Sequence, residues 1–289
     1  MLLSSITTVA AILAVMGIVA LLETVAPLHA RGPWGRAHLG PNLALTFITF
    51  ATNFAFNTGL VLTLQWLQLS GVGLLHLIRL PWLFAAIAAV LVLDFSFYLA
   101  HVTMHKVPAL WRFHLVHHSD PAVDVTTTIR QHPGESVIRY AFMAAAAFLL
   151  GVGPAVFAVY RVWSAINGLF EHANVRMPRR LDSLLSLVVI TPNMHKVHHS
   201  RSAAETDTNY GNIVSLFDRL FRTFTPSQRG LNITYGLDGF DDPARQTAAG
   251  LLALPFMGHA TSGPSDTKAG QTQGDGLPGS EIRAARARN

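Results

Sequence analysis

Three long apolar stretches limit what this chain can fold into. They cover residues 6–22, 43–69 and 82–100, and Asp94 is the only charged side chain within them. A helix of about 20 apolar residues crosses the hydrocarbon core of a bilayer, where every backbone polar group must be hydrogen-bonded within the protein. Charged residues make up 13% of the chain, against about 25% in a typical soluble protein. The sequence therefore predicts an all-α integral membrane protein with about three spanning helices.

The loop charges predict an orientation for these spans. No Lys or Arg precedes the first stretch and no small-residue cleavage site follows it, so we expect a retained helix rather than a cleaved signal peptide. Cytoplasmic loops carry an excess of Lys and Arg, which places the amino terminus and the loop with Arg79 outside. The cationic residues that we expect on the cytoplasmic side are Arg31, Arg36, Lys106, Arg112 and Arg130.

A fourth apolar stretch, residues 140–162, is interrupted by Gly151-Val-Gly153-Pro154. Histidine clusters precede and follow it, and they can share one site only if both lie on the same side of the membrane. We therefore expect a helical hairpin that turns near Gly153-Pro154 and returns to its starting face. The apolar run 184–190 is too short to cross, and we expect an interfacial or buried helix there.

The chain divides into four predicted segments. Residues 1–42 form an N-terminal membrane helix and loop, and residues 43–226 form a membrane-bound catalytic domain with a cytosolic helical cap. Residues 227–257 form a C-terminal apolar extension. Residues 258–289 are rich in small and polar residues, which predicts a disordered tail.

Ten of the 14 histidines fall between positions 101 and 199. Eight form three tight groups, His101-x3-His105, His114-x2-His117-His118 and His195-x2-His198-His199, and His132 and His172 lie between them. Neutral imidazole is a ligand for Fe, Zn, Cu and Ni, and a chain without Cys has no thiolate sites. We interpret the remaining histidines, His29, His38, His76 and His259, as packed or solvated.

Helical spacing predicts that these imidazoles converge. Asp94, Tyr98, His101 and His105 share one helical face, and each HxxHH also places its three rings on one face. Two adjacent imidazoles can turn toward different ions. Eight ligands exceed what one metal accepts, so two metals with four or five nitrogens each are expected. His132 and His172 are the candidates that complete this set.

Three carboxylates are candidates for orienting the ligands. An acid within an apolar stretch is a functional candidate, and for Asp94 we expect a hydrogen bond to a ligating imidazole. Glu135 and Asp124 are expected either to act in the same way or to be solvated.

Two other functions use the same residue types. A dizinc membrane hydrolase would also take imidazole ligands, but catalytic zinc usually keeps three protein ligands and an open position. A membrane protein that stores or senses metal is the second alternative, although transport favours polar residues at membrane depth, and the apolar stretches hold only Asp94.

The motifs resemble the fatty acid hydroxylase/sterol desaturase superfamily over about residues 42–224. The resemblance rests on the following strings: Asp94-x3-Tyr98-x2-His101-x3-His105, Trp111-Arg-Phe-His114-x2-His117-His118-Ser-Asp120, Arg130-x-His132-Pro-x-Glu135, His172-Ala-Asn174, Thr191-Pro-x-Met-His195-x2-His198-His199-Ser200, and Asn209-Tyr-Gly211 followed by Asp218-Arg-Leu-Phe. Val102 and Arg222 depart from the usual pattern without touching a predicted ligand.

The resemblance implies a membrane di-iron enzyme that uses O₂ and two electrons to hydroxylate or desaturate a lipid. Its ligands would be the eight grouped histidines and His172, with His132 as a tenth. Cleavage of an unactivated C–H bond also requires a redox metal, because no side chain is a strong enough oxidant. The chain has no Cys cluster or flavin-binding glycine motif, so a separate reductase is expected to supply the electrons. A bacterial inner membrane, with the histidines facing the cytoplasm, is the expected location.

Overall fold

The computed structural model describes residues 2–30, 32, 34–78 and 80–257, and within these ranges the chain is helical without a β-strand. This confirms the predicted all-α class. The predicted disordered tail 258–289, His259, Arg31 and Arg79 lie outside the described residues. The helices of the membrane part are α1 (Leu2–Val25), α3 (Leu39–Ser70), α4 (Leu74–Leu77), α5 (Trp82–Lys106), α7 (Pro133–Leu150) and α8 (Pro154–His172).

Three stretches of the described chain are long and apolar enough to cross a membrane, Ile6–Val25, Trp34–Leu77 and Trp82–Lys106. They agree with the predicted spans, and the protein is an integral membrane protein. The 32 residues of α3 extend over about 48 Å, more than the hydrocarbon thickness of about 30 Å. One end of α3 therefore projects beyond the bilayer and reaches the histidine-rich end of the molecule.

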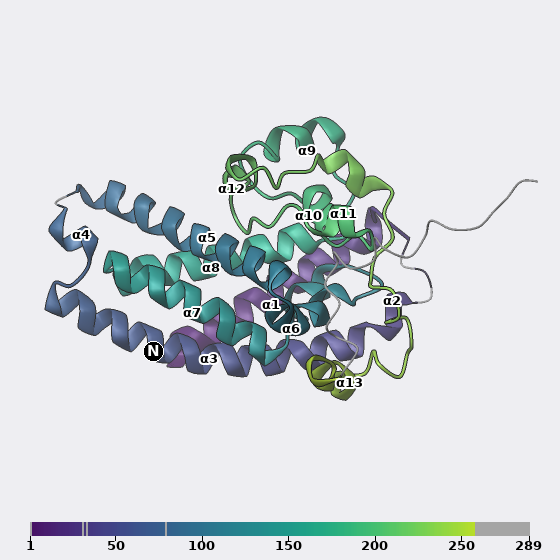
Figure 1. Cartoon of the computed structure of the whole chain (residues 1–289), viewed down its shortest axis with the longest axis horizontal. Helices are drawn as coiled ribbons and strands as arrows, with labels where there is room; N and C mark the ends of the chain where they lie inside the picture. The colour runs from purple at the N-terminus through teal and green to yellow at the C-terminus, as the bar shows by residue number, and fades with distance from the viewer. Residues whose placement is uncertain (1, 31, 33, 79, 258–289) are drawn as a thin grey trace, which may run out of the picture.

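The predicted hairpin is confirmed by α7 and α8, which run to the far end of the bundle and back (Figure 1). Helix α7 ends at Gly151, whose φ of 69° favours glycine, and Pro154 begins α8. The turn packs on the α3–α4 connection so closely that a Cβ on Gly73 would overlap the Gly151 backbone. Both arms pack against α5, so the hairpin is held from the turn to the histidines.

One apolar core joins the four helices α3, α5, α7 and α8. Its fully buried members include Leu64, Leu93, Ala147 and Tyr160, one from each helix. Between membrane helices such side chains stabilise the bundle through close van der Waals packing, since lipid is as apolar as the core. This packing gives the hairpin a fixed position relative to α5, which carries His101 and His105, the first of the three histidine boxes.

Short helices form a cap at the opposite end from α4 (Figure 1). They are α2 (Trp34–Ala37), α6 (Pro108–His118), η1 (Val125–Ile129), α9 (Arg179–Leu185), α10 (Pro192–His198), α11 (Ala203–Thr206), α12 (Leu216–Leu220), η2 (Ser227–Leu231), α13 (Ala248–Ala253) and η3 (Leu254–Phe256). The predicted helix over 184–190 is wrong in its bounds, because the helix ends at Leu185. Ile190 instead donates a backbone hydrogen bond of 3.0 Å to Ile213.

The predicted C-terminal extension packs back onto the rest of the chain. Leu251 and Leu254 join a buried cluster with Leu45 of α3 and Trp111 and Leu115 of α6. This cluster fixes α6, and with it the second histidine box, against the end of α3.

Candidate metal centre

Nine buried histidines form two groups at the junction of bundle and cap. His101, His105, His114, His118 and His198 form a group of five, and His117, His172, His195 and His199 form a group of four. Within each group the potential ligand nitrogens all lie within 4.8 Å of one another. The structure therefore brings together all three boxes and His172, as their spacing predicts.

Each HxxHH box contributes to both groups. In α6, His114 and His118 face the group of five, and His117 faces the group of four. The box at α10 has the opposite arrangement, with His195 and His199 in the group of four. Residues four apart lie one above the other on a helix, whereas the intervening histidine projects to one side. The predicted divergence of adjacent imidazoles is therefore present in both boxes.

The Nε2 atoms point inward in both groups. In the group of five, Nε2 of His114 lies 3.0 Å from Nε2 of His101 and 3.2 Å from that of His118. In the group of four, the corresponding separations from His172 are 3.0–3.2 Å to His117, His195 and His199. Several nitrogen lone pairs therefore meet at one point in each group.

Backbone carbonyls orient three of these rings. Nδ1 of His101, His172 and His198 lies 2.8 Å from the carbonyl oxygens of Tyr210, Gly168 and Thr208, respectively. A carbonyl only accepts, so Nδ1 carries the proton and Nε2 keeps its lone pair. Such contacts fix the tautomer and orientation of metal-ligating histidines.

Burial keeps the cap imidazoles neutral. Loss of solvent, reinforced for most of them by the neighbouring rings, holds the pKa well below the usual value for His114, His117, His118, His195, His198 and His199. Neutral imidazole is the form that binds metal. The Nε2 atoms of His105 and His198 are also buried without a hydrogen-bond partner among the described residues. Both belong to the group of five, and these unpaired acceptors fit a metal in the centre of that group better than a packed histidine core.

Glu135 occupies the place expected of a ligand-orienting carboxylate. Its side chain is fully buried, and Oε1 lies 3.2 Å from Nδ1 of His114. Oε1 also lies 2.6 Å from Nη2 of Arg139. The position agrees with the prediction, which left open whether this acid is solvated.

The carboxylates of Asp94 and Asp124 contact residues other than the nine grouped histidines. Asp94 accepts hydrogen bonds from the side-chain amide of Asn212 and the backbone N–H groups of Ile213 and Val214. The expected contact with a ligating imidazole is therefore wrong, because the carboxylate fixes the 212–214 backbone instead. Asp124 begins η1 and accepts from the backbone N–H of Thr126. It also accepts from the Thr126 hydroxyl, and its Oδ2 lies 3.4 Å from Nε2 of His38, which belongs to neither group.

His132 also lies outside both groups. Its Nδ1 accepts a hydrogen bond of 2.9 Å from the backbone N–H of Gly134 and so begins α7. Its Nε2 then carries the proton, and it lies 3.2 Å from the Leu252 carbonyl. Neither nitrogen has a lone pair left for a metal, which argues against the predicted tenth ligand.

Two carboxylates at the site escaped the sequence reasoning. Oε1 of Glu171 lies 3.7 Å from Nδ1 of His172 and 3.9 Å from Nε2 of His195. Asp207 lies 3.3 Å from Nδ1 of His105. Adjacency to His172 could have indicated Glu171, but no local pattern points to Asp207.

A buried polar network holds the second box against the bundle. Arg130 is fully buried and donates to the Val116 carbonyl, Asn42 Oδ1, Ser119 Oγ and Gln246 Oε1. The sequence reasoning used Arg130 only as a topological charge. It joins α3, α6 and the C-terminal segment.

Asp120 belongs to the same network. It lies 3.0 Å from Nδ1 of His38 and accepts from Asn42 and Thr127. Arg130 and His38 hold the pKa of this carboxyl well below its usual range, outweighing the opposite effect of burial. His38, interpreted from sequence as a packed or solvated residue, is packed in this network.

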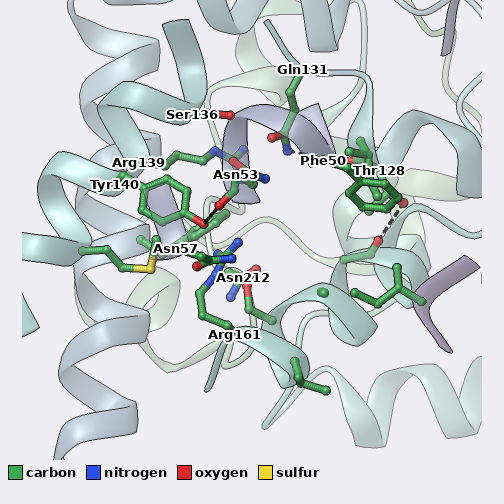
Figure 2. A pocket seen from close by; sticks show the side chains of 18 of the residues that line it. Phe50, Asn53, Asn57, Thr128, Gln131, Ser136, Arg139, Tyr140, Arg161 and Asn212 are labelled. Atoms are coloured by element: carbon green, nitrogen blue, oxygen red, sulfur yellow. Dashed lines mark hydrogen bonds between the residues drawn. The ribbon is translucent and has the colours of Figure 1, made fainter. Parts of the chain in front are cut away.

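A cavity of about 370 Å³ extends from the histidines into the membrane bundle. Side chains of α1, α3, α7 and α8 line it, and it reaches His101, His117, His172 and His195. Figure 2 shows polar side chains directed into it, among them Asn53, Asn57, Arg139, Tyr140 and Arg161. A molecule in this cavity would contact both histidine groups while remaining between membrane helices.

Comparison with known proteins gives consistent matches. Residues 86–223 match the family model for fatty acid hydroxylase. The ornithine lipid hydroxylase OlsE of Rhizobium tropici is 33% identical over 173 residues, which cover 60% of this chain and 50% of that protein. The alkylglycerol monooxygenase of Danio rerio is 32% identical over 164 residues, covering 56% of this chain and 35% of that protein.

A cholesterol 25-hydroxylase-like protein of Danio rerio is 29% identical over 152 residues, covering 50% of this chain and 57% of that protein. The chain thus spans between about a third and somewhat more than half of the length of these relatives. No solved structure matches. The matched segment contains every histidine of the two groups, so the part of the chain that would hold the metals is the part that is similar to the fatty acid hydroxylase family.

Proposed function

We propose that this protein is a membrane-bound di-iron oxygenase that hydroxylates or desaturates a lipid with O₂ and electrons from a separate donor. The observation that carries the proposal is the cavity between membrane helices that ends at two groups of buried, neutral imidazoles. The relatives support the substrate class, since their names specify an ornithine lipid and an alkylglycerol.

Nine histidines would hold the two metals, five in one group and four in the other. When bound, iron supplies the activation of O₂ that attack on an unactivated C–H bond requires. The chain's own contribution is to keep the imidazoles buried and neutral and to orient five of them, three through backbone carbonyls, His114 through Glu135 and His105 through Asp207. Both groups provide fewer than six nitrogens, so each metal would keep a position for a ligand from outside the chain.

The number of ligands favours iron over zinc. Five donors in one group exceed the four ligands that are usual for zinc.

The cavity determines how a substrate would approach. Because its walls come from α1, α3, α7 and α8, a lipid would reach the metals from the bilayer without passing through water. Burial of both groups excludes bulk water from the reacting atoms. Glu171 lines the metal end of the cavity, and its Oε2 accepts a long hydrogen bond of 3.4 Å from Asn167.

Location and partners complete the proposal. We infer that the histidine end faces the cytoplasm of a bacterium and that the inner membrane holds the protein, on the basis of the loop charges. A cytoplasmic position would place the metals within reach of a soluble or membrane-bound reductase, which we expect to be a separate protein.

Lipid analysis of cells that express the protein tests the function. Cells with the wild-type chain should contain an oxidised lipid, and cells with the His198→Ala variant should lack it. Formation should require O₂, and the purified protein should contain about two iron ions per chain. Turnover without O₂ or reductant, restored to stripped protein by zinc, would instead establish a hydrolase.

A further inference from the structure

Arg161 is a cation inside the membrane part of the cavity. Its guanidinium lies 5.2 Å from the centre of the Tyr140 ring, and its Nε is buried without a hydrogen-bond partner among the described residues. No described carboxylate lies within ion-pair distance of it. Arg139, the other arginine of the cavity, differs because it pairs with Glu135 at 2.6 Å and covers the Phe97 ring at 4.4 Å.

The position of Arg161 makes an uncompensated charge costly. The preceding residue, Tyr160, donates a hydrogen bond to the Leu93 carbonyl, near the middle of the membrane helix α5. A charge at this depth is rare, faces a cavity or partner and marks function. Contact with an aromatic ring offsets only about 0.5–2 kcal/mol of that cost. Among the described residues this positive charge has no carboxylate partner, and Tyr140 contacts it through its ring and its hydroxyl.

Neutral polar groups surround this charge. The side-chain oxygens of Asn53 and Asn57 are buried without partners among the described residues, and both side chains point toward the same part of the cavity as Arg161 (Figure 2). Closer to α1 the walls are apolar, with Val9 and Ile12 of that helix facing the cavity. A charged and amide-lined interior next to an apolar wall matches an amphiphile whose polar end enters the bundle.

Helix α8 connects this charge to the metal centre. Arg161, Ala165, Gly168 and His172 follow at i, i+4, i+7 and i+11, and all four line the cavity. Eleven residues of helix rise about 16 Å. An anion at Arg161 is therefore separated from the histidines by much of the length of an acyl chain, and the oxidised atom belongs to the chain rather than to the polar end of the lipid.

We propose that the guanidinium of Arg161 binds an anionic group of the lipid substrate, a carboxylate or a phosphate, and so selects anionic over neutral lipids, while the unpaired amide oxygens of Asn53 and Asn57 accept hydrogen bonds from neighbouring donor groups of the lipid. This inference rests on the proposed function for the identity of the bound lipid as substrate. Arg161 acts as a binding and specificity residue rather than a catalytic one.

Binding to the purified full-length protein in detergent tests the proposal without turnover. Radiolabelled palmitate is displaced by palmitate, hexadecyl phosphate or hexadecanol, which share a chain and differ in the polar group. The wild-type protein should bind at least one of the two anions about ten- to a hundredfold more tightly than the alcohol, the range expected for a charge-assisted hydrogen bond. The preferred anion then distinguishes carboxylate from phosphate lipids.

Variants of Arg161 test whether this residue causes the preference for anions over the alcohol. Arg161→Gln should bring the ratio close to one, Arg161→Lys should retain most of it, and Arg180→Gln, at an exposed position on α9, should leave it unchanged. Equal wild-type affinities for all three compounds, or a full preference in Arg161→Gln, would overturn the proposal. If Arg161→Gln does not fold, the proposal is judged from the ratio of anion to alcohol affinity in the wild type and in Arg161→Lys.

The two proposals can fail separately. Anion-selective binding in a protein that oxidises no lipid would leave Arg161 as a binding residue and remove the oxygenase assignment. Lipid oxidation without selectivity for anions would retain the oxygenase and remove the role of Arg161.

Discussion

Replacement of Glu135 by Gln should weaken one metal site and leave the other intact. Glu135 contacts His114, which belongs to the group of five, and among the described residues it makes no ion pair with the group of four. Loss of a carboxylate behind a ligating histidine typically lowers metal affinity about 10–100-fold. A Gln side chain can still accept a hydrogen bond from His114, so we expect about tenfold, or about 1.4 kcal/mol.

The same change affects stability independently of metal. Glu135 is fully buried and neutralises Arg139, whose side chain is 15% exposed. Breaking a fully buried ion pair costs about 3–5 kcal/mol. Partial exposure of Arg139 and its contact with the Phe97 ring reduce this, and we expect the metal-free Glu135→Gln protein to lose about 1–3 kcal/mol.

A chelator titration of the iron-loaded protein in detergent separates the two effects. One iron per chain should be released at about tenfold lower chelator concentration than in the wild type, and the second at the wild-type concentration. Arg139→Gln breaks the same ion pair but keeps the carboxylate at His114, so it should destabilise the protein without this selective release. Equal weakening of both sites, or unchanged release of both, would refute the assignment of Glu135 to the group of five.

Four further outcomes are expected. His132→Ala should keep both metals and lose about 0.5–2 kcal/mol of stability, because it removes a helix N-cap. His172→Ala should lose at least one metal. Metal analysis and thermal unfolding measure these effects, and metal loss in His132→Ala would restore His132 as a ligand. Arg130→Met should lower stability by about 3–5 kcal/mol, because four buried acceptors and Asp120 lose their partner; a melting temperature near the wild type would contradict this. The chain has no Cys of its own, so single cysteines can report the topology. Ser202→Cys on the cap should react with a membrane-impermeant thiol reagent from the cytoplasmic side, and Ser70→Cys should react from the other side, since both positions are exposed at opposite ends. Labelling of both from one side would reject the topology. Stability should fall as the pH falls below about 6.5, because the cap histidines have lowered pKa values in the folded protein and the unfolded chain therefore binds more protons there. Metal should be lost when the protein unfolds or when its ligands are protonated at lower pH. An unfolding free energy that does not fall between about pH 7 and about pH 5 would contradict this.

Periodicity and charge in the sequence were sufficient for the architecture. The apolar stretches predicted the spans, and Gly151-Val-Gly153-Pro154 predicted the turn between α7 and α8, because these residue types end one helix and begin the next. The helix at 184–190 was misplaced, since a pairing with residue Ile213 decides where it ends. Such a pairing between distant residues has no local signal.

Spacing within the boxes also determined that the imidazoles converge and divide between two centres. A helix fixes which side chains lie four residues apart on one face, so His114 and His118 must act together whatever surrounds them. The sequence could not decide which of the isolated histidines joins them. His172 enters because α8 returns to the cap, and His132 does not because its two nitrogens are used at the start of α7.

The surroundings of the site were decided by tertiary structure alone. Asp207 reaches His105 from 102 residues away, and Asp94 turns to the 212–214 backbone instead of a histidine. Arg161 is a candidate binding residue only because the packing of four helices places its charge inside a cavity. Local sequence fixes what a segment can form and which side chains share its face, because those depend on bonded geometry and solvent. Contacts between segments depend on how the whole chain packs, and only the folded structure determines them.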